Sequence, residues 1–462
     1  MSTAIGFDIG TTHLKWQLRD RDTGVLLQHG VHPVPPDTRA TRSEQAVAPI
    51  LQAVQEVIAQ ASQQGDLSQV AFSGAMHSLI AVDAKGLPRT ESLTWMDNRA
   101  APLVAQLRQQ GLHDMFRKAT GVPLHPMVPW VKWLWLKPHL PPEARPVALK
   151  DYIIHALTGE WVEDYSTAAA SGFLGLDAQW HPELLAMAQL TADSLPALKD
   201  MVDSLPCRAG DYRVVIGAND AASQHWHFGL EPGSPRAVIS LGTSGALRTT
   251  AATPVSAPDL FCYSLGPHRG FLVGAAFSNA GNVLQWLANV TNLPVPTLLE
   301  EAIQSLRRGT PLPFAVPYWY GERFPWWRTD LRGAWHDLAP EHGRAELAGA
   351  LLLAMAAGYW HALQRLEESG LTILDLVGAS GLLDLEPLAQ FLADALNRPL
   401  TVYPGVDASL AGAVDLAMGG VGRVMAPSSI NGRRHHPQDR TLPERVEAYW
   451  HRLAQTIRDQ QS

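Results

Sequence analysis

The stretch that decides the fold is AIGFDIGTT at residues 4–12, with LKWQL following at residues 14–18. The first segment is an apolar run that ends in a Gly-Thr-Thr turn, and the second alternates apolar with polar residues. This pattern predicts a β-hairpin with a polar tip, and a third strand at residues 25–30 completes an expected meander. The chain is therefore expected to begin with a strand-rich α/β unit.

A second stretch of the same kind begins at residue 238 and reads VISLGTSGALR. Its SLGTS aligns with the DIGTT of the first hairpin, and an internal repeat of this kind indicates duplicated halves. The turn-rich EPGSP at residues 231–235 is typical of a linker between them. We expect two α/β domains, residues 1–234 and 235–462, on either side of a central cleft.

Hydrophobic periodicity predicts the remaining elements. Apolar residues at helical spacing indicate a helix over residues 44–60, and short apolar runs indicate strands at residues 70–72 and 214–216. A polar loop over residues 425–440 and a C-terminal helix over residues 441–460 are expected to end the chain. Tryptophans gather in two further places, where we expect core packing: Trp130, Trp133, Trp135, Trp326 and Trp327.

The composition excludes several classes of protein. A chain of 462 residues, 46% hydrophobic and 17% charged, suits a globular protein of two domains. The net charge is −8, and a solvated turn explains the basic residues at 433–436, so no nucleic-acid partner is expected. No run of about 20 apolar residues could span a membrane. Two cysteines without metal-ligand spacing fit a reducing compartment, which predicts a cytoplasmic protein.

The two Gly-Thr turns are the first candidates for chemistry. Successive backbone N–H groups in a tight turn, together with Thr and Ser hydroxyls, can hold phosphate oxygens. The sequence contains no GxxxxGK[ST] motif, so a P-loop site is excluded. Either turn alone is common in plain hairpins, whereas the pair favours two phosphate-binding turns that face each other across the cleft.

Two aspartates lie beside these elements. Asp8 precedes the first turn, where the second turn has Ser240. A carboxylate there would repel phosphate unless Mg²⁺ lay between them, and the alternative is an aspartate that only orders the turn. Asp220 ends an apolar strand, where side chains project into the cleft of α/β folds. It is equally suited to accept the proton of a sugar hydroxyl or to cap the helix that begins at Ala221.

Two further segments are typical of sugar sites. The segment SGAMHS at residues 73–78 follows a strand, and its His77 could bind a hydroxyl or be purely structural. The segment WMDNR at residues 95–99 combines an aromatic face with polar groups that suit hydroxyls. The alternative for this segment is a helix start with Asp97 as its N-cap.

Seven segments, taken in order, resemble the FGGY carbohydrate kinases, a family of the actin/hexokinase/Hsp70-like ATPase fold. The resemblance covers almost the whole chain. It implies an α/β protein of two duplicated ribonuclease H-like domains, with ATP and Mg²⁺ as cofactors and a small sugar or sugar acid as substrate. The segments are residues 8–12, 74–77, 95–99, 127–133, 217–220, 242–244 and 321–325.

Within the family, residues 75–80, 94–100 and 125–127 look most like those of gluconate kinases, with xylulose kinases next. The resemblance implies that Asp220 is the catalytic base and that Asp8 and Asp220 hold Mg²⁺. The sugar would lie near Met76, His77, Asp97, Asn219 and Asp220. ATP would contact Gly10, Thr11, Thr12, Lys15, Gly242, Thr243, Ser244, Gly378, Ser380 and Gly381. A substrate carboxylate would seek a cation or strong donors, for which the candidates are Arg99, Lys132 and His77.

The second half departs from the family pattern. A Gly-Gly pair of the adenine region reads Ser380-Gly381 here, Leu385 stands where a serine is usual, and Asp337 replaces the glycine of a Gly-Leu signature. We therefore weigh four hypotheses: a gluconate kinase, a kinase of xylulose or another polyol, an inactive sugar-binding regulatory relative, and an actin-like polymerising ATPase. A homodimer is compatible with each kinase hypothesis.

Overall fold

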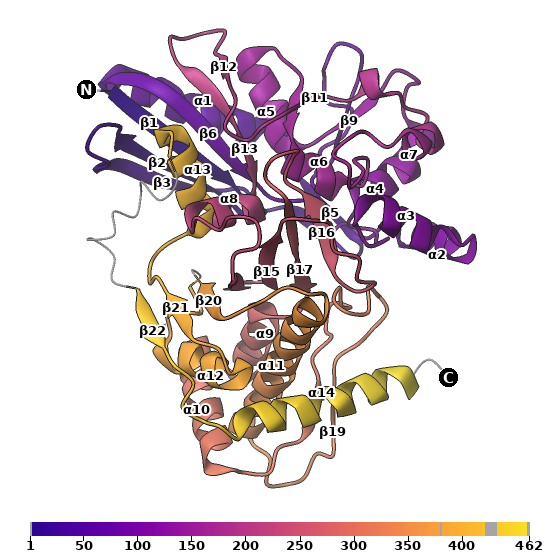
Figure 1. Ribbon diagram of the computed structural model, residues 1–462, viewed down its shortest axis with the longest axis vertical. Coiled ribbons are helices and arrows are strands. Elements are labelled where there is room, and N and C mark those ends of the chain that lie inside the picture. The colour runs from indigo at the N-terminus through magenta and orange to yellow at the C-terminus, as the bar shows by residue number, and fades with distance from the viewer. Residues whose placement is uncertain (1, 379–380, 421–431, 460–462) are drawn as a thin grey trace.

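The computed structural model describes residues 2–378, 381–420 and 432–459, and it folds into two α/β halves (Figure 1). The first half is built on a six-stranded sheet of order β12-β13-β6-β1-β2-β3. In it β1 pairs antiparallel with β2 and parallel with β6, and β6 pairs parallel with β13. The strands are β1 (Ser2–Ile9), β2 (His13–Asp20), β3 (Leu26–Pro33), β6 (Asp66–Gly74), β12 (Ser204–Pro206) and β13 (Arg213–Asn219).

The second half is built on a seven-stranded sheet of order β16-β17-β15-β14-β20-β21-β22. In it β14 pairs antiparallel with β15 and parallel with β20, and β20 pairs parallel with β21. The strands are β14 (Arg236–Leu241), β15 (Gly245–Ala251), β16 (Phe261–Ser264), β17 (Phe271–Phe277), β20 (Asp375–Gly378), β21 (Leu400–Val402) and β22 (Arg433–His435).

The two sheets repeat the same plan, which confirms the predicted duplication. Each half begins with a hairpin, and each hairpin has a parallel strand on its other side. The register differs at the tips. Ile9 pairs with Leu14, whereas Leu241 pairs with Gly245, so the second turn is one residue shorter.

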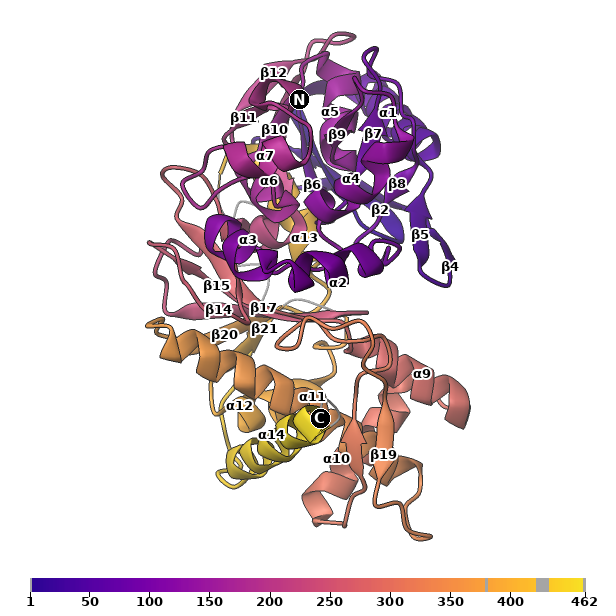
Figure 2. The same cartoon turned by 90° about the vertical axis from the view of Figure 1, so that its right-hand side faces the viewer.

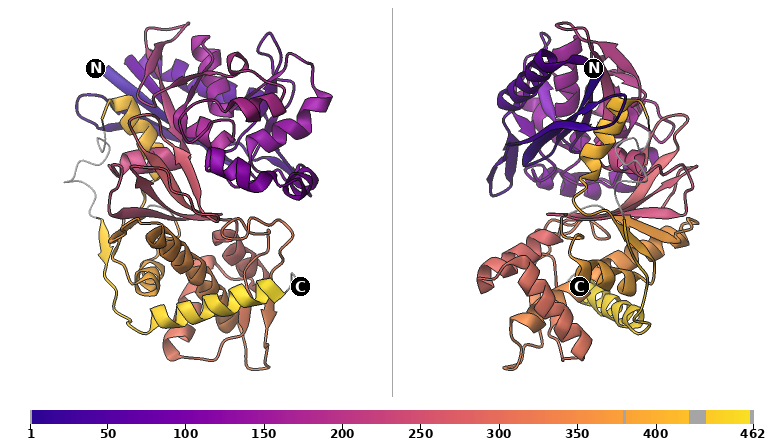
Figure 3. Two further views of the ribbon diagram at one scale, coloured as in Figure 1. Left: turned by 45° about the vertical axis from the view of Figure 1, so that its right-hand side comes forward. Right: turned by 90° about the vertical axis from the view of Figure 1, so that its left-hand side faces the viewer.

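Side-chain alternation along β1 sends its residues to two different helix layers. Large apolar residues such as Phe7 pack under α1 (Val47–Gln64) and α5 (Leu149–Thr158). The opposite face is covered by α8 (Asp220–His227) and α13 (Ala408–Met418). Helix α13 belongs to the second half of the sequence, yet Figures 1 and 3 show it lying against the first sheet. Gly6 permits this approach, because a Cβ there would meet the Val414 backbone at 2.5 Å.

The second sheet is covered by a helical layer centred on α11 (Arg344–Glu368), which contacts α9 (Gly281–Thr291), α10 (Val295–Arg308), α12 (Glu386–Leu396) and α14 (Leu442–Asp459) (Figure 2). By length and hydropathy α11 could cross a membrane, but 72% of its apolar window is buried inside the protein. The α11 helix is therefore a core helix of the second half. The helix α14 confirms the C-terminal helix expected from the sequence.

Some expected boundaries are wrong. The first helix does not begin at Glu44, because residues Arg42–Gln45 form β5, which pairs with β8 (Ser92–Leu93). The basic residues near 433 form strand β22 on the sheet edge rather than a turn, and Arg434 ion-pairs with Asp375. Residues 425–431 of the expected polar loop lie outside the described residues, and residues 433–435 of it form β22 rather than loop.

Trp130 and Trp133 of α4 (Pro129–Leu136) are fully buried core residues, as expected, whereas Trp135 is only partly buried. The other elements of the described chain are short. They are β4 (Asp37–Arg39), β7 (Ile80–Val82), β9 (Arg145–Val147), β10 (Val162–Asp164), β11 (Ala197–Lys199), β18 (Phe314–Val316), β19 (Ala334–His336), α2 (Ala101–Gln109), α3 (Leu112–Thr120), α6 (Tyr165–Ser171) and α7 (Pro182–Met187), with 3₁₀ turns at Lys137–His139 and Ala192–Ser194.

Candidate active site

Asp8 lies close to two other aspartates, Asp220 and Asp407. Asp8, near the end of β1, is buried and accepts a hydrogen bond from Ser73 Oγ at 2.9 Å. Burial above all, together with Asp407 and Asp220, raises the pKa of Asp8 to about 8, although Lys15 and the Ser73 hydrogen bond oppose the rise. Asp407 caps α13 and ion-pairs with Lys15 at 2.5 Å. Both other carboxylates are therefore close enough to Asp8 to disfavour its charge.

Sequence reasoning missed Asp407, although a signal was present. The chain reads NDAAS from Asn219, after β13, and VDAS from Val406, after β21. Each segment begins the helix that follows the last parallel strand of its half. The internal repeat therefore includes these two helix starts as well as the two hairpins. Each half contributes one aspartate at the start of such a helix.

The aspartates fit a cation that is shared with a phosphate. Mutual repulsion and burial raise the pKa of Asp8, and a bound cation would relieve both effects. In the described part of the chain, no group of three His, Cys, Asp or Glu side chains is placed to hold a metal. Mg²⁺ is commonly bound by one or two carboxylates together with water and phosphate oxygens. Asp8 and Asp220 would be the protein ligands in such a site.

Asp220 is the first residue of α8, but it is not the cap of that helix. Asn219 is the cap, and its Oδ1 accepts a hydrogen bond from the Ala222 N–H at 2.9 Å. The Nδ2 of Asn219 donates to the Ser166 carbonyl, so this side chain orders the turn. The pKa of Asp220 is raised by burial, while Arg248 and the backbone N–H groups of Ala221 and Met76 oppose the rise. A buried carboxylate with a raised pKa is suited to proton transfer.

Two arginines of the second half reach the same place, and sequence reasoning missed both. Arg248 lies on β15 and Arg323 follows the GE turn at residue 321, and each is only 8% exposed. Both lower the pKa of Asp220 and of His77. Arg323 also lies over the Trp95 ring, 4.7 Å from its centre. A charged residue inside a strand whose other residues are small, apolar or hydroxyl residues was the available signal for Arg248.

His77 is buried and held in a left-handed backbone conformation with φ of 65°. Its Nδ1 lies 2.9 Å from the carbonyl of Ala170. Burial above all, together with Lys132 and Arg323, lowers the pKa of His77 to about 3, so the ring is neutral. Because a carbonyl only accepts, Nδ1 carries the proton and Nε2 is left as an acceptor suited to a hydroxyl.

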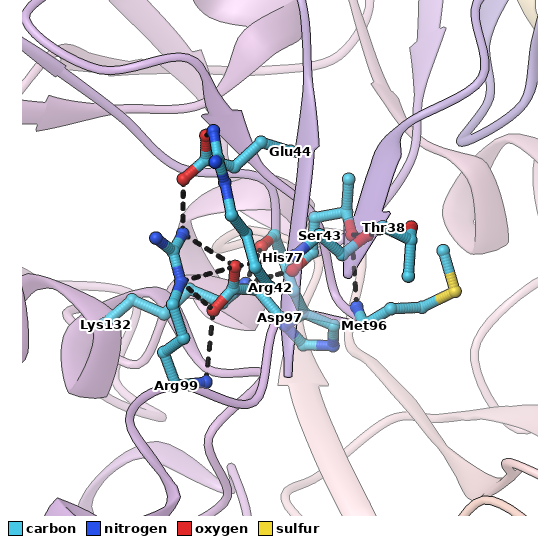
Figure 4. Close-up of polar contacts among 10 residues, drawn as sticks. Thr38, Arg42, Ser43, Glu44, His77, Met96, Asp97, Arg99 and Lys132 are labelled. Carbon is cyan, nitrogen blue, oxygen red and sulfur yellow. Dashed lines mark hydrogen bonds and ion pairs between the residues drawn. The ribbon is translucent and has the colours of Figure 1, made fainter. Parts of the chain in front are cut away.

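Lys132 and Asp97 belong to a buried polar network around His77 (Figure 4). Lys132 Nζ donates to the carbonyls of His77 and Thr94 at 2.8 and 2.7 Å. Burial lowers the pKa of Lys132 to about 7. Its donors hold the backbone of the His77 turn, and its side chain is fully buried, so it is not placed to meet a substrate carboxylate.

Asp97 is bound to Arg99 and to the backbone of Ser43 (Figure 4). Arg99 also forms an ion pair with Glu44. The charged groups of Asp97 and Arg99 are therefore both bound to partners within the protein. Helix α2 begins only at Ala101, so Asp97 is not its N-cap. The network fixes the wall of the site rather than presenting free charges to it.

The two Gly-Thr turns present polar groups to solvent at the cleft. Thr12, Gly242 and Thr243 are exposed, and each turn is closed by a backbone bond from its glycine, Gly10 N to His13 O and Gly242 N to Ser244 O, both at 3.0 Å. Lys15 follows the first turn on β2. Exposed N–H and hydroxyl groups at such turns are suited to phosphate oxygens.

A cavity of about 620 Å³ opens beside the second turn. The predicted residues Gly242, Thr243 and Gly381 line it, whereas Gly378 packs against Leu383 at the end of β20 and does not. The predicted Ser380 lies outside the described residues. The amides and the aromatic ring that α9 adds to this wall were not predicted from the sequence: Asn282, Gln285, Trp286 and Asn289.

The duplicated sheets and the site between them define a protein of the actin/hexokinase-like α/β fold, which confirms the predicted fold class. The chain belongs to the FGGY family of carbohydrate kinases. Residues 3–204 match the N-terminal domain of that family and residues 237–420 match its C-terminal domain. The division at residue 234 stays a prediction.

Named relatives agree with this family and include more than one substrate class. The chain is 28% identical to a gluconokinase of Bacillus subtilis (strain 168), over 96% of this chain and 93% of the relative. It is 29% identical to a xylulose kinase of Escherichia coli (strain K12), over 76% of each chain. A crystal structure of gluconate kinase from Lactobacillus acidophilus has a TM-score of 0.87 at 25% identity and covers 99% of this chain and 97% of that one.

Proposed function

We propose that the protein transfers the γ-phosphoryl group of ATP to D-gluconate, giving 6-phosphogluconate and ADP. The observation that carries this proposal is Asp220, a buried carboxylate with a raised pKa that lies close enough to Asp8 to raise the pKa of that residue as well. Gluconate is preferred as acceptor because the likeness to the gluconokinase covers 96% of this chain, against 76% for the xylulose kinase.

In this mechanism Asp220 accepts the proton of the attacking sugar hydroxyl as that oxygen approaches the γ-phosphorus. General base catalysis of this kind contributes on the order of 10²–10⁴-fold. The two Gly-Thr turns orient the phosphates. Mg²⁺, held by Asp8 and Asp220, would supply charge neutralisation on the phosphate oxygens. Closure of the two halves on both substrates would exclude water and limit ATP hydrolysis.

The second candidate is a kinase of xylulose or another polyol, and the 29% identity to a xylulose kinase favours it. The same base and turns would serve that reaction. An inactive sugar-binding relative is the third candidate, because Ser380-Gly381 departs from the family pattern.

An ADP-release assay with Mg²⁺-ATP separates these candidates. The panel contains gluconate, xylulose, ribulose and glycerol, with Asp220→Asn beside the wild type. We expect turnover on gluconate that falls by about 10²–10⁴-fold in the variant. Turnover on a neutral polyol alone would mean that the substrate is that polyol and not gluconate. No turnover by a folded wild type on any compound would contradict the proposed kinase activity.

We also propose that the protein is cytoplasmic and forms a homodimer. Light scattering after size exclusion tests the second point, and a mass near 50.3 kDa would contradict it.

A further inference from the structure

Arg248 is an unusual residue for its position. All seven residues of β15 are buried, and six of them are small, apolar or hydroxyl residues. A guanidinium in such a strand loses its hydration, which costs free energy unless a partner compensates it. A charged side chain retained at this place therefore indicates a partner that bears negative charge.

The partners within the protein do not satisfy this guanidinium. Arg248 Nε is buried without a hydrogen-bond partner, and Nη1 reaches Gln224 Oε1 only at 3.4 Å. Asp220 is the carboxylate that acts on it most strongly. In the proposed mechanism that carboxylate takes up a proton, so it cannot serve as a permanent counter-ion.

Arg323 lies in the same region, and its guanidinium also lacks part of its hydrogen-bond partners. Its Nη2 donates to the Phe277 carbonyl at 2.6 Å, while Nε is buried without a partner. The adjacent carboxylate of Glu322 is occupied by the backbone N–H groups of Ser278 and Arg323 and by the amide of Asn279. Arg248 lowers the pKa of Arg323, which shows that the two cations act on each other.

The other titratable groups that face the two arginines do not offset their charge. His77 is neutral, and Lys132 adds positive charge when protonated. Burial raises the pKa values of Tyr263 and Tyr359, so both phenols are neutral. The wall opposite Asp220 and His77 thus carries an excess of positive charge.

We propose that Arg248 and Arg323 bind the carboxylate of the substrate and select a sugar acid over a neutral polyol. This inference rests on the proposed function. Planar guanidinium groups pair with carboxylates through parallel N–H donors, which the unused Nε atoms can supply. Arg248 is four residues beyond Ser244 of the phosphate turn, so its backbone lies about 13 Å along the strand from that turn. An extended six-carbon acid is shorter than that spacing, so one molecule could reach from the turn to the arginine.

The test compares gluconate with D-glucitol, which has a CH₂OH group in place of the carboxylate. We would measure kcat/KM for both compounds, and their Kd by calorimetry, for the wild type and for Arg248→Met, Arg248→Lys and Arg323→Lys. We expect the preference for gluconate to fall on the order of 10²-fold in Arg248→Met, with part of it restored in Arg248→Lys. Arg236→Met, on the neighbouring strand β14, is the control and should keep the wild-type preference.

An equal loss on both compounds in Arg248→Met, with unchanged selectivity, would overturn the proposal and assign Arg248 to the phosphoryl group. If the wild type phosphorylates only neutral polyols, the proposed function itself fails. If the wild type phosphorylates gluconate and both Arg248 variants keep its preference, only this inference fails. Thermal unfolding of each variant shows whether a loss comes from misfolding, and Arg248→Lys retains the charge should Arg248→Met not fold.

Discussion

At the scale of single residues, the site depends on charges that are buried and only partly compensated. Asp8, Asp220 and Asp407 come from three distant segments, and the last two both raise the pKa of Asp8. Hairpin and strand-end patterns placed Asp8 and Asp220 near the cleft from sequence alone. Arg248 and Arg323 could not be placed in this way, because no local pattern says which side chains of a second sheet will face the first.

The pH dependence of the reaction follows from Asp220. The base must be deprotonated, and burial raises its pKa above the usual 3.8, so kcat/KM should fall as pH decreases through that raised pKa. The positive charge of Arg248 lowers the pKa of Asp220. Arg248→Lys keeps that charge, so the pH at which the rate falls on the acid side should change little. A pH–rate profile at saturating Mg²⁺ measures the limb. A profile that stays flat down to pH 4 would contradict the role of Asp220.

Lys132 should make stability depend on pH. The folded state releases its proton at about pH 7, whereas the unfolded chain keeps it to about 10.5, so the contribution of Lys132 to stability rises with pH across that window. Lys132→Met leaves two buried carbonyls without donors and should cost about 1–3 kcal/mol at pH 9, and less at pH 6.

Urea unfolding at both pH values measures the effect of Lys132→Met. Exposed Lys118, on α3, provides the control, since Lys118→Met should change stability little at either pH. A loss for Lys132→Met that does not depend on pH would argue against a buried lysine with a lowered pKa.

At the scale of elements, the two halves are joined by helix packing that the sequence does not reveal. Helix α13 carries Asp407 to the first sheet and lies against α8, which begins with Asp220. The duplication could be predicted from the two matching hairpins in the sequence. The packing of α13 against the first sheet could not be predicted, because its uniformly buried, apolar sequence fits the core of either half.

Gly412 allows α8 and α13 to approach closely. A Cβ at this position would lie 2.0 Å from the Ser223 carbonyl oxygen, so Gly412→Ala must push the two helices apart. We expect a loss of about 1–3 kcal/mol in unfolding free energy and a lower kcat, because Asp220 and Asp407 move with their helices. Gly349→Ala in α11 is the control, since its nearest neighbour would lie at 3.4 Å. Equal stability and activity of the two variants would show that this contact does not position the aspartates.

At the scale of the whole molecule, each half contributes a Gly-Thr turn and a helix that starts at an aspartate, Asp220 in the first half and Asp407 in the second. Substrates that bind both halves should draw them together. Small-angle scattering with a non-hydrolysable ATP analogue and gluconate together should give a smaller radius of gyration than either ligand alone. An unchanged radius would indicate that the cleft is already closed.

The central claim is phosphoryl transfer to a sugar acid with Asp220 as the base. The most direct measurement is ³¹P NMR of a reaction that contains the protein, Mg²⁺-ATP and gluconate, beside the same reaction with Asp220→Asn. The account predicts one new phosphomonoester that forms in step with ADP, and a rate about 10²–10⁴-fold lower in the variant. ADP that accumulates with inorganic phosphate instead, or a variant as fast as the wild type, would contradict it.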